Sequence, residues 1–498
     1  MGIIIKQSIK GSIWSYVGVI IGFVTTTYLY TEYLTTEIVG LFGLLAAYAA
    51  LTGQLFLLGF QGVTSRLFPY FRNTQKKHNG FLFIALLVFI IGFSVFLAAY
   101  YSFKPLLVES NLEKSALFAQ YVHLLIPLTF FSMAFIFLDT YNRLLYDAVT
   151  GTFFQEFLQR LLLFAIVVSF AVNLINLHQL ILAFTLVLCL KGLFLFVFLL
   201  KKEEISFRPQ LNFMDQKLKK EIWSVALYSV LASLGSIFVF NIDKIFINQF
   251  LDLSNTGVYT IAFYFGTLVV IPSRPLLKIS GTLIADAWKR NDLAQIESIY
   301  RKSCINQFII GGFLFLGIWA NVDNILIILG EDYLQSKWVI FFVGLGYLFD
   351  MMTGANGLII SYSKYYKVAL YFIVSLILVS VFLLYVLIPI WGITGAAIAI
   401  ASALLLNNLM RYLFILAKYR LQPFNYKFLI VAGFYIAVYS FLELIPQFRL
   451  IPDIAARGLI ITILSGLFYL FSQISKDISH LIHNLLKKLS KLILPKSR

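Results

Sequence analysis

Long apolar stretches separated by short polar loops run through the whole 498-residue chain. A bilayer core of about 30 Å needs roughly 20 apolar residues per helix, and the chain repeats stretches of about that length. Ten-residue segments of alternating polarity, which would indicate a membrane barrel, do not occur, so helices are the predicted way to satisfy the backbone. The pattern predicts an all-α membrane protein with about fourteen transmembrane helices. The predicted spans are 12–31, 39–62, 81–103, 117–142, 151–172, 178–200, 222–250, 257–285, 303–325, 338–361, 368–388, 393–416, 428–446 and 457–475.

Lysine and arginine gather at both ends of the chain and in every second predicted loop. Arg66, Lys76 and Lys77 follow the second span, whereas the first loop carries the acids Glu32 and Glu37. By the positive-inside rule, both termini are expected to face the cytoplasm. The net charge of +16 is then explained by loops beside anionic lipid, and no nucleic-acid partner is expected.

The last predicted element is not a span. In 476–498, leucine and isoleucine recur at helical spacing, with Lys487, Lys488 and Lys491 among them. A helix of this kind is too polar to cross a bilayer and is expected to lie on the inner membrane surface. The first span lacks a small-residue cleavage site after it and is expected to be retained.

Catalytic and metal chemistry find little support in the sequence. Cys189 and Cys304 cannot build a disulfide framework or a zinc site, and the five histidines are scattered. No phosphate-binding loop of the GxxxxGK[ST] type occurs. The predicted external loops are too short to carry the catalytic carboxylates of a membrane glycan polymerase or ligase. The sequence therefore favours a protein that is not an enzyme and holds no cofactor or metal.

Two segments six spans apart resemble each other. The first comprises 10–15 and 34–41, and the second comprises 220–224 and 253–259. Each has a basic residue and a tryptophan at the inner end of a span, then a leucine, a hydroxyl residue and a glycine at the outer end. The hydroxyl and amide side chains after the leucine can cap the next helix, and the glycine allows close packing at its start. Both spans run in the same direction, so the halves are predicted to be parallel repeats.

This repeat divides the chain into lobes. We expect an N-terminal lobe at 1–200, a cytoplasmic linker at 201–221 and a C-terminal lobe at 222–416. Two additional spans at 417–475 and the amphipathic helix at 476–498 complete the chain.

Several short motifs carry a family resemblance. They are the opening Lys6-Gln7-Ser8 to Trp14-Ser15, the turn Leu34–Gly40, the run Asn241-Ile-Asp243-Lys244 and the turn Gly392-Ile-Thr-Gly395-Ala-Ala. Together with length, span number and orientation, they resemble bacterial polysaccharide-biosynthesis flippases. These are the O-antigen or capsule repeat-unit exporters of the multidrug/oligosaccharidyl-lipid/polysaccharide exporter superfamily.

The resemblance implies two lobes around a central cavity in the inner membrane. It implies that an undecaprenyl-pyrophosphate-linked oligosaccharide moves from the inner to the outer leaflet by alternating access. It further suggests membrane lipids, a polysaccharide polymerase and a chain-length regulator as partners. A lipid II flippase, a multidrug exporter with an acid-dominated cavity, and a membrane glycan polymerase or ligase are the alternatives.

Basic residues inside spans are the first candidates for a substrate site, because an ionisable group at bilayer depth is costly and usually faces a cavity or a partner. Lys191 lies near the middle of its span, so we expect it to line the cavity rather than form a structural ion pair. Arg274 and Lys278 are one turn apart beside two prolines, and they favour either an anion site or snorkelling towards the cytoplasm. Arg411 lies nearer the inner end, where snorkelling is favoured.

Acids and amides complete the candidate set. Asp350 could pair with a cavity cation or carry a coupling proton. Asp243 and Lys244 are adjacent on a helix, so we expect them to point in different directions without neutralising each other. Gln54 and Asn241 could bind sugar hydroxyls or join helices.

Two pairs spaced four residues apart, Asp139 with Arg143 and Glu156 with Arg160, are interpreted as structural helix pairs.

Overall fold

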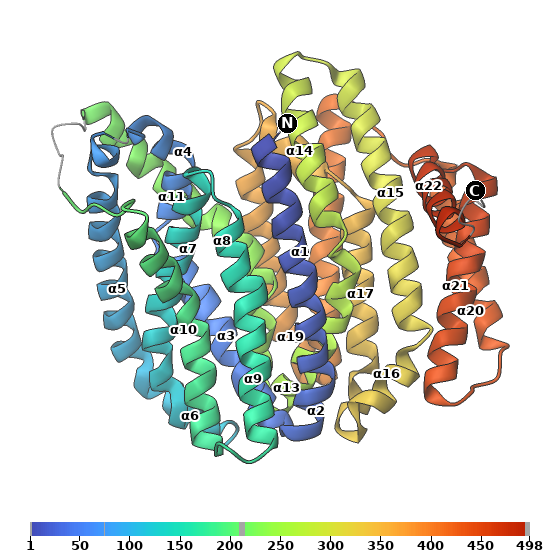
Figure 1. The fold of residues 1–498 in the computed structure, drawn as a ribbon, viewed down its shortest axis with the longest axis horizontal. Coiled ribbons are helices and arrows are strands. Elements are labelled where there is room, and N and C mark those ends of the chain that lie inside the picture. The colour runs from blue at the N-terminus through green and yellow to red at the C-terminus, as the bar shows by residue number, and fades with distance from the viewer. Residues whose placement is uncertain (1, 74, 209–214, 494–498) are drawn as a thin grey trace. The chain divides into compact units, whose positions relative to one another are not determined.

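The computed structural model describes residues 2–73, 75–208 and 215–493, and every regular element in them is helical. The chain divides into two compact units, unit 1 at Met1–Ile261 and unit 2 at Ala262–Arg498. Figure 1 shows that each unit is built from long helices that run mostly side by side. Part of the predicted linker 201–221 and the end of the predicted helix 476–498 lie outside the described residues. The predicted all-helical membrane fold is confirmed.

Unit 1 contains the following helices, the last of which crosses the boundary with unit 2. They are α1 (Gly2–Val24), η1 (Thr25–Leu29), α2 (Tyr30–Tyr33), α3 (Thr36–Phe56), α4 (Phe60–Phe71), η2 (Lys77–Gly80), α5 (Phe81–Glu109), α6 (Ala116–Tyr121), η3 (Val122–Leu124), α7 (Leu125–Leu144), α8 (Val149–Thr152), η4 (Phe153–Leu158), α9 (Gln159–Ala171), α10 (Leu177–Lys201), α11 (Gln216–Val239), α12 (Ile242–Phe250) and α13 (Leu253–Thr267).

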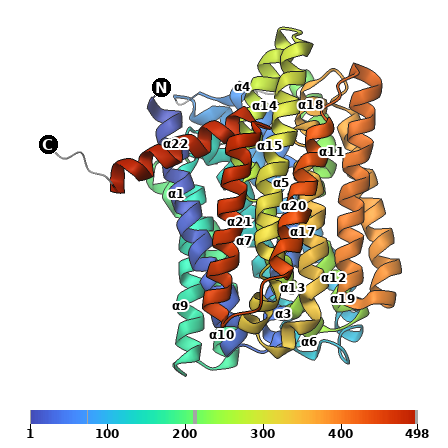
Figure 2. The same ribbon diagram turned by 90° about the vertical axis from the view of Figure 1, so that its right-hand side faces the viewer.

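Unit 2 continues with η6 (Leu268–Val270), α14 (Ser273–Lys289), α15 (Leu293–Trp319), α16 (Val322–Leu329), η7 (Glu331–Ser336), α17 (Lys337–Met352), α18 (Asn356–Tyr362), α19 (Val368–Tyr419), α20 (Tyr426–Glu443), α21 (Leu450–Ser472) and α22 (Lys476–Ile493). Figure 2 shows α22 turned across the direction of α21.

Within the described residues, 11 helices are long and apolar enough to cross a membrane, or 12 if the bent pair α17 and α18 forms one span. The helix α19 contains two of the predicted spans, joined at Gly392, whose backbone is not helical (φ 57°, ψ −136°). A Cβ atom on Gly395 would lie 2.0 Å from the carbonyl oxygen of Leu387, which indicates a tight reversal of the chain. The exact number of fourteen and the orientation of the termini stay predictions.

The predicted span 222–250 is broken. Helix α11 ends at Val239 and α12 begins at Ile242, and Asn241 between them has a non-helical φ of −136°. The break places Asp243 in the first turn of α12, where a carboxylate is favoured by the helix dipole. The Nζ atom of Lys244 lies 3.7 Å from Oδ1 of Asp243. The expectation that these two charges point apart was therefore wrong: the Lys244 side chain runs back to donate to the carbonyl oxygen of Phe240 at 2.8 Å, which brings its ammonium beside the Asp243 carboxylate.

The two repeated turns meet within unit 1. A Cβ atom on Gly40 would lie 1.9 Å from the carbonyl oxygen of Leu253, and one on Gly257 would lie 1.9 Å from that of Thr36. The hydroxyls of Thr36 and Ser254 are 2.6 Å apart. The predicted close packing at both glycines is confirmed, and the contact is reciprocal.

The predicted caps are confirmed at one turn only. Oγ1 of Thr35 accepts a hydrogen bond from the N–H of Ile38 at the start of α3. At the second turn the acceptor is Asp252, which bonds to the N–H of Asn255 at 2.7 Å. A carboxylate directly before α13 thus replaces the hydroxyl and amide side chains that the sequence comparison favoured.

Aromatic side chains dominate the core of unit 1. The ring of Phe68 lies 5.2 Å from that of Phe81 and 5.1 Å from that of Tyr141, centroid to centroid. Phe60 and Phe71 are also buried in this cluster. These rings fasten α4, α5 and α7 together at one end of the unit.

Candidate functional site

A cavity of about 500 Å³ lies inside unit 1 and is lined by residues from seven segments. Its lining residues are Ala46, Ala49, Ala50, Gln54, Gln61, Ser132, Phe135, Ile136, Asp139, Arg143, Gln155, Gln159, Leu188, Lys191, Ile237, Phe240 and Asn241. Three of the six predicted substrate-binding residues, Lys191, Gln54 and Asn241, meet here although they are far apart in the sequence.

Two glycines bring the walls of the cavity together. A Cβ atom on Gly53 of α3 would lie 2.7 Å from Cβ of Ser132, and one on Gly192 of α10 would lie 2.7 Å from the carbonyl oxygen of Phe131. Helices α3 and α10 therefore both approach α7 closely, as Figure 1 shows. The alanines of α3 leave open the space that larger side chains would fill.

Lys191 is the unpaired charge of this cavity. Its ammonium lies 5.2 Å from the centroid of the Phe135 ring, a cation–π contact. It forms no hydrogen bond or ion pair with any residue that the structure describes.

The start of α10, the helix that carries Lys191, is fixed by a capping box, in which Asn176 and Gln179 each accept a hydrogen bond from the other's backbone N–H at 2.9 Å.

The other two charges of the cavity neutralise each other. Arg143 donates to Asp139, four residues earlier on α7, which confirms the predicted helix pair. The second predicted pair, Glu156 with Arg160, is confirmed at 2.8 Å. Because Asp139 is paired, the charged groups lining the cavity leave a net positive charge on Lys191.

Amide side chains provide most of the remaining polarity. Nε2 of Gln54 donates to Oε1 of Gln61 at 3.0 Å, and Nδ2 of Asn241 donates to the carbonyl oxygen of Ile237 at 2.8 Å. Oε1 of Gln159 is buried without a partner among the described residues. It is therefore available to a donor that enters the cavity.

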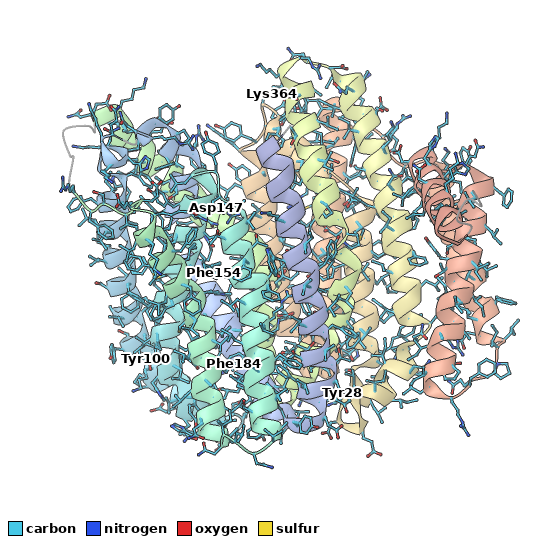
Figure 3. All side chains as sticks on the ribbon, in the orientation of Figure 1. Tyr28, Tyr100, Asp147, Phe154, Phe184 and Lys364 are labelled. Carbon is cyan, nitrogen blue, oxygen red and sulfur yellow. The ribbon has the colours of Figure 1, made fainter. Side chains whose placement is uncertain are left out.

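Gln155 and Gln159 were missed by the sequence interpretation. Gln155 belongs to η4, a π-helical turn, and Gln159 begins α9. Figure 3 labels Phe154 in η4 and Phe184 in α10, the neighbouring segments that carry Gln155 and Lys191. π-Helical turns are rare and often occur at functional sites. The spacing of the two glutamines, four residues apart in an apolar span, was the available signal.

The remaining predicted residues lie elsewhere. Asp243 is fully buried in unit 1, where it accepts a hydrogen bond from the Tyr259 hydroxyl at 2.7 Å. Arg274 and Lys278 are exposed on α14 of unit 2. Arg411 is partly buried in α19, next to Gly357 of α18.

Asp350 is held by amides in unit 2. Its Oδ1 accepts a hydrogen bond from Nδ2 of Asn408 at 2.8 Å, and Oδ1 of Asn408 accepts from Thr353 and Asn356, each at 3.0 Å. This network spans the break between α17 and α18, where the helices bend by 49° and Gly354 has a φ of +58°.

Proteins of known structure share this fold. The chain superposes on the lipid II flippase MurJ in an inward closed conformation with a TM-score of 0.71 and 15% identity, over 93% of this chain and 99% of that one. An inward-facing multidrug resistance MATE family transporter of the MOP superfamily gives a TM-score of 0.56 and 15% identity, over 87% and 100% of the two chains.

A curated relative matches part of the chain. A probable low-salt glycan biosynthesis flippase of Haloferax volcanii is 26% identical over 210 residues, which are 39% of this chain and 41% of the relative. The chain thus spans about two fifths of the length of the curated relative that it matches.

A family model closes the comparison. The family described as polysaccharide biosynthesis protein matches residues 6–284, more than half of the 498 residues. The chain is therefore a multi-pass inner-membrane protein with the fold of the multidrug/oligosaccharidyl-lipid/polysaccharide exporters, and it belongs to the polysaccharide biosynthesis protein family.

Proposed function

We propose that this protein flips anionic lipid-linked oligosaccharides, with undecaprenyl-pyrophosphate-linked repeat units as its substrates. The observation that carries the proposal is the unpaired ammonium of Lys191 in the cavity of unit 1. A cation near the bilayer centre costs about 2.5–3.5 kcal/mol on insertion scales, and among the described residues no acid forms an ion pair with Lys191 that would offset this cost. An anionic substrate group would offset it.

The amides fit the sugar part of such a substrate. Gln54, Gln61, Gln155, Gln159 and Asn241 offer both donors and acceptors to hydroxyl groups. A cavity of about 500 Å³ lies within the usual range for small-molecule sites, so it would hold a few sugar units and not a lipid tail. We place the tail outside, in the bilayer.

Further cations are proposed to help bind the pyrophosphate group of the substrate. Arg274 and Lys278, both exposed and one turn apart on α14, offer a second pair of anion-binding groups. Arg411 is a weaker candidate because it packs beside Gly357. For Asp350 and Asp243 we propose a part in ion or proton coupling.

Transport would proceed by alternating access of two lobes. Movement of a net anionic substrate outward is favoured by a membrane potential that is negative inside, by about 2.3 kcal/mol per charge per 100 mV. A polymerase and a chain-length regulator would then receive the repeat unit at the outer surface.

The charge of the cavity disfavours the multidrug alternative. An exporter of cationic drugs needs an uncompensated acid, whereas Asp139 is paired with Arg143 and Lys191 is unpaired. A lipid II flippase would share the anionic lipid carrier and differ only in the glycan.

Transport in cells tests the proposal. Cells that lack the protein are expected to accumulate unexported lipid-linked oligosaccharide, and the wild-type gene should remove it. Lys191→Gln should abolish this rescue, because the anion loses its partner, while Lys191→Arg should retain most of it. Lys364→Gln, which removes an exposed loop cation, is the matched control and should rescue fully.

Two results would contradict the proposal. If the deleted cells accumulate no lipid-linked sugar but become sensitive to cationic drugs, the protein is a drug exporter. If Lys191→Gln rescues as well as Lys364→Gln while protein levels are equal, the cavity cation does not bind the substrate.

A further inference from the structure

The junction between α21 and α22 is a fixed corner and not a loose tail. Gln473 turns the chain with a φ of +47°. Ser475 donates a hydrogen bond to Oδ1 of Asn306 on α15 at 2.5 Å, and Ser479 donates to the carbonyl oxygen of Tyr469 at 2.7 Å. Helix α22 is thus held against two transmembrane helices of unit 2.

A cavity of about 380 Å³ lies at this corner. It is lined by Leu470, Gln473, Lys476, Ser479, His480 and His483. Three of these, Lys476, His480 and His483, are spaced i, i+4 and i+7, so they share one face of α22. The described lining thus offers an ammonium, two imidazoles, an amide and a hydroxyl, and no carboxylate.

The nearest acid of α22 is turned to another partner. Oδ2 of Asp477 accepts a hydrogen bond from Nδ2 of Asn306 at 3.0 Å. The neighbouring cation Lys427 of α20 donates to the carbonyl oxygen of Ile474 at 2.9 Å. No group of three or more residues suited to a metal ion occurs among the described residues. The cluster of Lys476, His480 and His483 therefore favours binding of an anion.

The opposite face of α22 indicates where this cavity lies. Ile478 and Ile482 pack against the core of unit 2, whereas Leu481 and Leu485 are 56% and 53% exposed. Figure 2 shows α22 running across the end of the transmembrane helix α21. A helix with apolar and cationic faces in this position lies in the headgroup layer of a membrane.

We propose that the α21–α22 corner binds the phosphate group of an anionic membrane phospholipid. The ammonium of Lys476 and the ring N–H groups of His480 and His483 would donate to the phosphate oxygens. The side chain of Leu470 would contact the first part of the acyl chains. The site is separate from the cavity of unit 1 and does not depend on the transported substrate.

Native mass spectrometry of the full-length protein in detergent tests this site. Phosphatidylglycerol is titrated against the wild type and the variant K476Q/H480Q/H483Q, in which glutamine keeps good helix propensity. We expect the variant to bind phosphatidylglycerol at least about fivefold more weakly than the wild type does. Phosphatidylcholine should bind both proteins weakly and equally.

The matched control is K364Q/K367Q/K418Q, which removes three exposed lysines of the same unit. It should bind phosphatidylglycerol like the wild type, and equal unfolding midpoints in phosphatidylcholine would show that all three proteins are folded. If both triple variants bind phosphatidylglycerol equally weakly, the loss comes from the lower net charge and not from this site, and the proposal is overturned. Unchanged binding in K476Q/H480Q/H483Q would also overturn it, as would displacement of the lipid by equimolar inorganic phosphate.

Discussion

Asp243 is the most completely buried acid described in unit 1, and its carboxylate has two hydrogen-bond donors and one ammonium nearby. It accepts hydrogen bonds from the Tyr259 hydroxyl and from the N–H of Lys244, whose ammonium is 3.7 Å away. Asp243→Asn would remove the carboxylate beside this buried ammonium, which also donates to the carbonyl oxygen of Phe240 at 2.8 Å, and breaking a buried ion pair costs about 3–5 kcal/mol. We expect a large drop in the thermal unfolding midpoint of the purified protein. D243N/K244M should recover much of this loss; if the double variant is as unstable as the single one, the ion pair is not the cause.

Asp147, which lies outside the membrane-spanning helices, is expected to make the stability of the protein depend on pH. Burial raises the pKa of this carboxyl, but hydrogen bonds from Lys202 and from Thr150 outweigh it and lower the pKa below its ordinary value of 3.8. Oδ1 also accepts from the N–H groups of Val149 and Thr150 at the start of α8, and Figure 3 labels this residue. The stabilisation is therefore present above the ordinary pKa and is lost as the pH falls through the lowered one.

Asp147→Asn is accordingly expected to lower stability by about 1 kcal/mol at pH 7. Unfolding measured between pH 7 and pH 3 should show the wild type and the variant converging as the pH falls. A constant difference across this range would contradict the assignment of the effect to the charge.

At the scale of helices, the sequence predicts where spans lie but not where they break. The stretch 222–250 predicts one helix, and the polar run Asn241-Ile-Asp243-Lys244 within it does not by itself show that the helix breaks at Asn241. The reversal at Gly392 was predicted because the turn that begins at Gly392 separates the two apolar spans 368–388 and 393–416. Breaks inside apolar runs depend on tertiary contacts, such as the hydrogen bond between Asp243 and Tyr259, which join residues distant along the chain.

The reciprocal glycine contact makes a sharp prediction for helices α3 and α13. Gly40→Ala and Gly257→Ala should each destabilise the protein by about 1–3 kcal/mol, because the added Cβ would lie 1.9 Å from a backbone oxygen. Gly433→Ala on α20 is the control. A Cβ there meets nothing within 4 Å and should raise stability by about 0.5–1 kcal/mol. Unfolding midpoints that fall equally in all three variants would show that the contact is not the cause.

At the scale of the whole molecule, the orientation of the chain can be tested with cysteines. The native Cys189 and Cys304 are buried, so the wild type should react poorly with a membrane-impermeant maleimide. Leu174→Cys and Glu331→Cys, in predicted outer loops, should be labelled in intact cells. Lys76→Cys and Lys364→Cys should be labelled only after lysis. Labelling in the reverse pattern would place the termini outside.

The candidate site was only partly predictable from the sequence, because it too depends on contacts between residues far apart in the chain. Lys191 stands out in sequence because a cation in the middle of an apolar span is costly. Gln155, Gln159 and Gln61 do not, since an amide in a span can equally join two helices. Only the structure shows that amides from α3, α4, η4 and α9 line one cavity.

The contact between the repeated turns also has a genetic consequence. Both glycines are opposed by carbonyl oxygens of the main chain, those of Leu253 and Thr36, and not by side chains. No smaller residue at either opposing position would make room for an added methyl group. Second-site suppressors of Gly40→Ala should therefore not arise at Leu253 or Thr36. They should arise where a substitution lets α3 or α13 shift as a whole, at the caps and joints of these two helices.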